Sequence, residues 1–102
     1  MSTIVDTYNM QLGMIIPRGA HTSNNSLSSA VTLTKPTSAR SILVQALTQN
    51  VRYTLDGTTP TTSVGFQLKA GDPPVIIPVF NATIQFIEET ATAVLQYQWS
   101  SV

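Results

Sequence analysis

Apolar and polar positions alternate over short stretches of this chain, and Gly or Pro separates the stretches. The clearest stretch is 93–99, where apolar residues at odd positions alternate with Val94, Gln96 and Gln98. A period of two residues is typical of a β-strand with one buried face. Further strands are predicted at 31–34, 41–48, 51–55, 66–68, 75–80 and 83–86. We therefore predict an all-β fold: a single β-sandwich of about seven short antiparallel strands with an extended N-terminal arm and no helix.

Turn residues and one proline refine this prediction. Asp56-Gly57 and the segment 70–74 are predicted turns, because Asp caps backbone amides and Gly accepts a positive φ. Pro78 places its strand at an edge or at a bulge, since proline cannot donate to a ladder. The core is predicted from the same-face positions of the alternating strands, which are Tyr53, Leu55, Phe66, Leu68, Phe86, Leu95 and Tyr97.

The N-terminal third has a different pattern from the rest. Apolar side chains at Met10, Leu12, Met14 and Ile16 predict a strand over 10–16, which Pro17 and Gly19 end. Residues 20–29 are small and polar with no period, which is typical of a loop or tether. We therefore divide the chain into an arm with its tether (1–29) and a sandwich body (30–102). We expect the arm to contact a neighbouring subunit; the alternative is that it forms the first strand of its own sandwich.

Composition narrows the function. Charged residues make up 10% of the chain, with five basic and five acidic residues, against about 25% in ordinary soluble domains. Zero net charge argues against a nucleic-acid partner. An uncharged polar surface fits either an extracellular β-protein or a subunit packed against other subunits, because desolvating charges at an interface is costly. The N-terminus lacks a basic region and no apolar run reaches about 18 residues, so neither a signal peptide nor a membrane span is expected.

Few residues carry candidate chemistry. His21 is the one histidine and there is no cysteine, so we expect no enzyme, no cofactor and no metal site. Glu88 and Glu89 are neighbours, which point to opposite faces of a strand. Asp56 and Asp72 are conceivable calcium ligands but lack D-x-D spacing. Tyr53, Tyr97 and Trp99 lie on the apolar faces of alternating strands, so core packing is expected for them. The alternative for Trp99, near the C-terminus, is partial exposure with stacking on a glycan or a neighbouring subunit.

Two resemblances extend this interpretation. The stretch VRYTLDGTTPT at 51–61 resembles the Y-T-x-D-G-x-x-P-T hairpin of the small β-sandwich appended to chitobiase-type glycosidases, which specifies a strand and a turn but no activity. The body as a whole is similar to small β-sandwich proteins encoded among the virion structural genes of tailed bacteriophages. The segments that carry this similarity are VQALT, NVRYTLDGTTPT, GFQLKAGDPP and FIEETATAVLQYQW.

The second resemblance implies a non-enzymatic role in a virion. We expect a capsid decoration or cement protein that bridges capsid subunits, with the major capsid protein and copies of itself as partners, most simply in a homotrimer. It would be made in the host cytoplasm and lie on the outer surface of the head. The alternatives are a neck, tail or fibre-associated subunit, and a carbohydrate-binding module. The candidate interaction residues are Met10, Leu12, Met14, Ile16 and Trp99.

Overall fold

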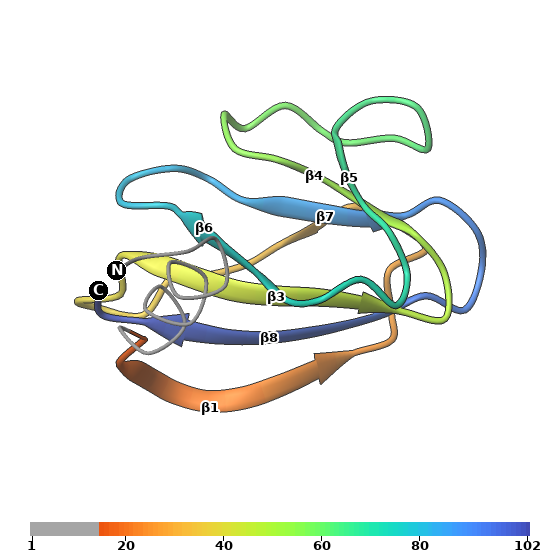
Figure 1. Cartoon of the computed structure of the whole chain (residues 1–102). Helices are drawn as coiled ribbons and strands as arrows, with labels where there is room; N and C mark the ends of the chain where they lie inside the picture. The colour runs from red at the N-terminus through yellow and green to blue at the C-terminus, as the bar shows by residue number, and fades with distance from the viewer. Residues whose placement is uncertain (1–14) are drawn as a thin grey trace, which may run out of the picture.

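The computed structural model describes residues 15–102, which form two four-stranded antiparallel sheets and, within that range, no helix (Figure 1). The sheet-forming tendency follows from the β-branched, alternating segments seen in the sequence. The all-β sandwich prediction is therefore confirmed. The strands are β1 (Pro17–Asn24), β2 (Val31–Thr32), β3 (Ser41–Leu47), β4 (Val51–Thr54), β5 (Phe66–Leu68), β6 (Val75–Pro78), β7 (Gln85–Glu88) and β8 (Val94–Ser100).

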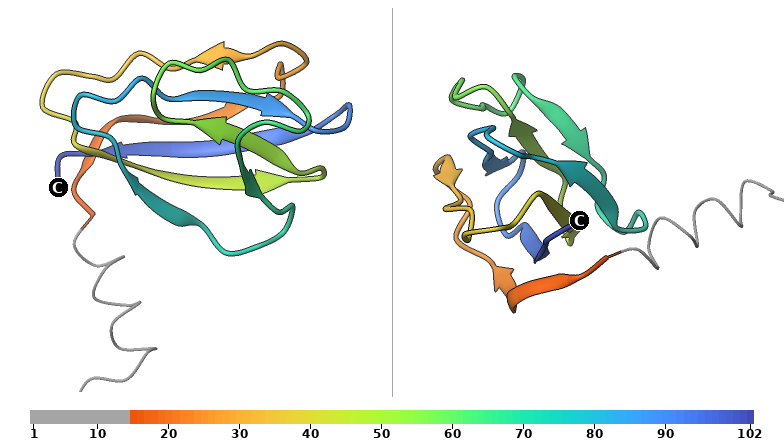
Figure 2. Two further views of the ribbon diagram at one scale, coloured as in Figure 1. Left: turned by 90° about the horizontal axis from the view of Figure 1, so that it is seen from above. Right: turned by 90° about the vertical axis from the view of Figure 1, so that its left-hand side faces the viewer.

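The strand order follows a simple rule. Sheet A has the order β1-β8-β3-β6 and sheet B has the order β2-β7-β4-β5. The first strand pairs with the last, the second with the seventh, the third with the sixth and the fourth with the fifth, as in one long hairpin rolled up on itself. Contacts of β3 with β8 and of β4 with β7 close the roll. This is the arrangement of an eight-stranded jelly roll, and Figure 2 shows its two layers from further directions.

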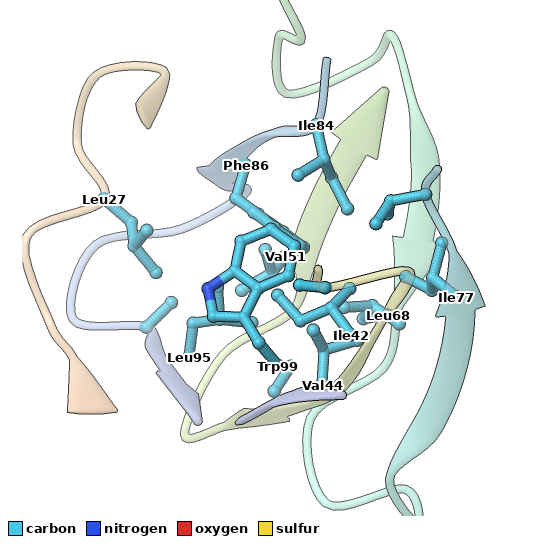
Figure 3. Packing of buried hydrophobic residues seen from close by; sticks show 14 residues of the cluster. Leu27, Ile42, Val44, Val51, Leu68, Ile77, Ile84, Phe86, Leu95 and Trp99 are labelled. Carbon is cyan, nitrogen blue, oxygen red and sulfur yellow. The ribbon is translucent and has the colours of Figure 1, made fainter. Parts of the chain in front are cut away.

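The core lies between the two sheets, where alternate residues of each strand point inward. On β3, Ile42 and Val44 are buried and lie opposite Trp99 and Tyr97 of β8. Sheet B contributes Phe86, which is fully buried. Figure 3 shows the larger members of this cluster: Leu27, Ile42, Val44, Val51, Leu68, Ile77, Ile84, Phe86, Leu95 and Trp99.

The core prediction is correct for most positions and wrong for one. Leu68, Phe86 and Leu95 are buried, and Tyr53, Leu55 and Tyr97 are half-buried against the core. Phe66, in contrast, is 64% exposed. Its register partner is Tyr53 of β4, and because β5 is the edge strand of sheet B, the ring has a strand neighbour on that side alone.

The prediction of a polar tether at 20–29 is wrong. Residues 17–24 form β1, which pairs with β8, and Leu27 is 1% exposed within the core. An edge strand keeps much of its side-chain surface in water, so small polar residues are compatible with it. The register shifts between Arg18 and Thr22, and Gly19 has a φ of +75° there. Pro17 thus begins a strand, and the described part of the predicted arm belongs to the sandwich.

The other local predictions agree with the structure. Strand β6 is an edge strand of sheet A and Pro78 is its last residue, as the missing N–H donor required. In the first predicted turn the Thr58 amide donates to the Asp56 carboxylate at 3.0 Å. In the second, the Asp72 amide donates to the Lys69 carbonyl at 3.2 Å.

Residues 15–102 contain no helix long and apolar enough to cross a membrane.

Candidate functional site

The outer face of sheet A carries almost no charge. Strands β3, β6 and β8 contain no Asp, Glu, Lys or Arg, and in the fourth strand, β1, the charged residue is Arg18. Inward positions such as Ile42 are core residues, so the residues next to them along the same strand point outward. The outward residues of these strands pair across the sheet, and we call them the glutamine face: Leu43, Gln45, Ile76, Gln96 and Gln98.

Hydrogen bonds hold the glutamine face in place. The Gln96 amide accepts a bond from His21 Nε2 at 2.6 Å and donates one to Ser23 Oγ at 2.7 Å, which ties β8 to β1. The Gln98 amide donates to the Gly19 carbonyl at 2.9 Å, and the Gln45 amide donates to the Asp72 carbonyl at 3.1 Å. These side chains therefore lose little rotamer freedom when a partner covers them, which lowers the entropic cost of binding.

The outer face of sheet B differs, because it carries an ion pair. Arg52 Nε donates to Glu89 Oε2 at 2.8 Å, and Gln67 Nε2 donates to the same oxygen at 2.7 Å. The hydrogen bond from Gln67, followed by the charge of Arg52, lowers the pKa of the Glu89 carboxyl. The two outer faces are thus chemically distinct, and that of sheet A, which carries no ion pair, has the lower desolvation cost.

A groove lies at the end of the β4–β5 hairpin. It has a volume of about 510 Å³ and its apolar walls are Tyr53, Leu55, Val64 and Phe66. The Tyr53 and Phe66 rings have centroids 5.5 Å apart and are tilted by 44°. We call this feature the hairpin groove; its remaining lining residues are Thr54, Asp56, Thr58 and Gly65.

Two residues of the hairpin groove show how the sequence shapes it. Gly65 has a φ of +129°, and a Cβ there would come within 2.9 Å of the Tyr53 carbonyl oxygen, so the close approach of the two strands requires glycine. Hydrogen bonds from Thr58 lower the pKa of the Asp56 carboxyl, which keeps a negative charge at the rim. The groove is therefore an apolar cleft with a polar, acidic border.

The structure describes two of the five predicted interaction residues, Ile16 and Trp99. Met10, Leu12 and Met14 lie outside the described residues. Ile16 is 55% exposed, and its backbone is fixed to the C-terminal segment: its amide donates to Ser100 Oγ at 3.1 Å and its carbonyl accepts from Ser101 at 2.9 Å. The chain therefore enters the sandwich at a defined point beside its own C-terminus.

Trp99 packs in the core as expected, and the alternative that it is partly exposed is wrong. Its side chain is 5% exposed and lies in the core, with the Tyr97 ring edge-on at 6.5 Å. The reason is that β8 lies between β1 and β3, so a residue close to the chain end occupies the middle of a sheet. A sugar ring needs an open aromatic face for stacking, and this indole does not offer one.

Two of the acidic residues, Glu88 and Glu89, have structural roles. Glu88 Oε1 accepts from the Ala93 amide at 3.3 Å, while Glu89 pairs with Arg52. In the part of the chain that the structure describes, no group of three or more His, Cys, Asp or Glu side chains could hold a metal ion, so Asp56 and Asp72 form no such site.

The sequence signal for the glutamine face was the absence of charged residues from the three segments that form β3, β6 and β8. Only the strand topology brings these segments into one sheet.

The jelly-roll order is found in proteins of several functions, including viral capsid proteins and lectins. No protein-family model matches the chain, and comparisons with curated proteins and with solved structures found no match. Fold alone does not determine function. The function is therefore inferred from the two surface features, the glutamine face and the hairpin groove, together with the sequence.

Proposed function

We propose that this protein is a structural subunit of a bacteriophage virion, a decoration protein that binds the outside of the capsid and bridges its subunits. The observation that carries the proposal is the glutamine face, an ordered sheet surface with no charged residue on β3, β6 or β8. The jelly-roll strand order and the similarity of the body to small virion sandwiches support the same role.

The physical argument concerns the cost of burying a surface. Interface cores are depleted in charged residues because a charge loses its hydration when a partner covers it. On the glutamine face, amides supply neutral hydrogen bonds while Leu43 and Ile76 supply apolar contact. Each copy needs only modest affinity, because a capsid presents many equivalent sites and linked copies gain avidity.

The direct test is quantitative mass spectrometry of purified virions whose genome encodes the chain. A decoration protein should be present in hundreds of copies per particle, because it occupies repeated sites of the head. A few tens of copies or fewer would instead identify a neck, tail or fibre subunit. Absence of the chain from the particles would refute the virion role.

A second test addresses the face itself. In Gln45→Lys the new ammonium can still donate to the Asp72 carbonyl, but it places a charge on the glutamine face. The matched control is Gln67→Lys, which can still donate to Glu89 on the other sheet. We expect the first variant to bind capsids at least tenfold more weakly, and the control to bind capsids as the parent does. Equal binding by both variants would refute the role of this face.

The carbohydrate-binding alternative depended on Trp99 and on the hairpin resemblance. Burial of Trp99 removes the aromatic platform that this alternative required. The resemblance at 51–61 specifies a strand and its turn, which the structure uses to build β4 and the hairpin. We therefore retain the assembly role as the single proposed function.

A further inference from the structure

Exposed apolar side chains gather at the hairpin groove. Val64 is 45% exposed and Phe66 is 64% exposed, and both line a cleft whose other walls include Tyr53 and Leu55. Its volume of about 510 Å³ lies within the range of about 300–1,000 Å³ that is usual for binding sites. A partner that covered this cleft would remove its exposed apolar side chains from water.

The hairpin groove also lies beside a free sheet edge. Strand β5 ends sheet B and pairs with β4 alone among the described strands. An edge strand with an adjacent apolar cleft suits strand addition, in which an extended segment pairs with the edge and places alternate side chains in the cleft. The occupant should therefore be extended, with apolar residues at every second position.

We propose that the hairpin groove receives residues 10–14 of a second copy of this chain. The segment Met10-Gln11-Leu12-Gly13-Met14 has the required alternation. Methionine side chains adapt to irregular clefts, and their sulfur atoms make favourable contacts with aromatic rings such as those of Tyr53 and Phe66. This proposal rests on the proposed function, in that it names the contact through which neighbouring copies are linked.

Chain length determines that the occupant comes from another copy. Figure 1 and Figure 2 show β1 and the β4–β5 hairpin on opposite sides of the sandwich. From β1 to the far edge of sheet A there are three strand intervals, about 14 Å in all, and the two sheets are about 10 Å apart. Met14 precedes Pro17, the start of β1, by three residues, which span at most about 10–11 Å. Met14 therefore cannot reach the groove of its own body.

Cysteine cross-linking tests the contact in the full chain, which contains no cysteine. One variant carries Leu12→Cys and a second carries Val64→Cys, a position already exposed to solvent. Mixed under mild oxidation, the two should form a disulfide-linked heterodimer, since strand addition brings the two Cβ atoms close to the separation of about 4 Å that a disulfide needs. The control pair replaces Val64→Cys by Ser28→Cys, an exposed position in the β1–β2 connection.

The expected result is a heterodimer yield at least tenfold above that of the control pair, and a clear decrease when Phe66→Ser is added to the Val64→Cys chain. Yields equal to the control would overturn the proposal. A chain carrying both cysteines that closes an intramolecular disulfide at high dilution would also overturn it, because the arm would then occupy its own groove. If cross-linking fails while Gln45→Lys still weakens capsid binding, the proposed function stands and only the arm contact is wrong.

Discussion

Replacing Leu27 by Ala removes a buried side chain from a segment that reads as a polar tether. Leu27 is flanked by Ser26 and Ser28, yet it is 1% exposed and lies in the core. Its backbone carbonyl accepts a hydrogen bond from the Glu88 amide at 3.0 Å, which alanine would retain. The substitution therefore isolates the contribution of the side chain.

The magnitude follows from transfer and from the cavity. Leucine exceeds alanine by three carbon atoms, and burial of each is worth about 0.8 kcal/mol, so the transfer contribution is about 2.4 kcal/mol. Incomplete relaxation around the cavity raises typical Leu→Ala losses to about 2.7–5 kcal/mol. For a domain of this size the melting temperature should fall by at least about 10 °C.

Urea unfolding followed by tryptophan fluorescence measures this loss, because Trp99 lies in the same core. The midpoint should decrease while the slope stays constant, since a lower slope would indicate a changed denatured state. Val64→Ala is the control, because its side chain is 45% exposed and its loss should stay below about 1 kcal/mol. A Leu27→Ala loss no larger than that of the control would refute the burial of this segment and the assignment of β1 and its connection to the sandwich.

Three further predictions concern sheet B. Glu89→Gln should cost at most about 1 kcal/mol at neutral pH. Gln67 and Arg52 lower the pKa of the folded carboxyl below its ordinary value, so the contribution is present above that ordinary pKa and is lost as pH falls through the folded pKa, and the two melting curves should converge in acid. Gly65→Ala should cost about 1–3 kcal/mol in urea unfolding, because of the positive φ and the contact with the strand backbone; an unchanged midpoint would contradict it. Phe66→Ala should cost less than about 1 kcal/mol, since the ring is 64% exposed; a core-sized loss of about 3–5 kcal/mol would show that the ring is buried after all.

Most of the body was predictable because its strands have strong local signals. The alternation at 93–99 and the apolar run at 41–48 identify β8 and β3, whose length and periodicity hardly depend on their partners. Pro78 identified an edge strand because the missing N–H is a property of the residue itself. The turn at Asp56-Gly57 was predictable for the same reason, since its hydrogen bond is formed between near neighbours.

The N-terminal strand was not predictable, because its stability is not local. Residues 17–24 have no apolar period, and their pairing partner β8 is far along the chain. The amide of Gln96 joins His21 and Ser23 to that strand, and no pattern within 17–24 indicates it. The burial of Leu27 depends likewise on the connection from β1 to β2 passing over the core.

The sequence by itself determined that this protein is an all-β sandwich with a neutral surface, because strand periodicity and net charge are properties of the chain. The tertiary structure decided where those properties are concentrated. The rolled pairing places β8 between β1 and β3 and so buries Trp99 in the core. It also leaves Phe66 at an open edge and brings three charge-free segments into one sheet. Burial and surface chemistry depend on which distant strands become neighbours, and that choice is made by the whole fold rather than by any one segment.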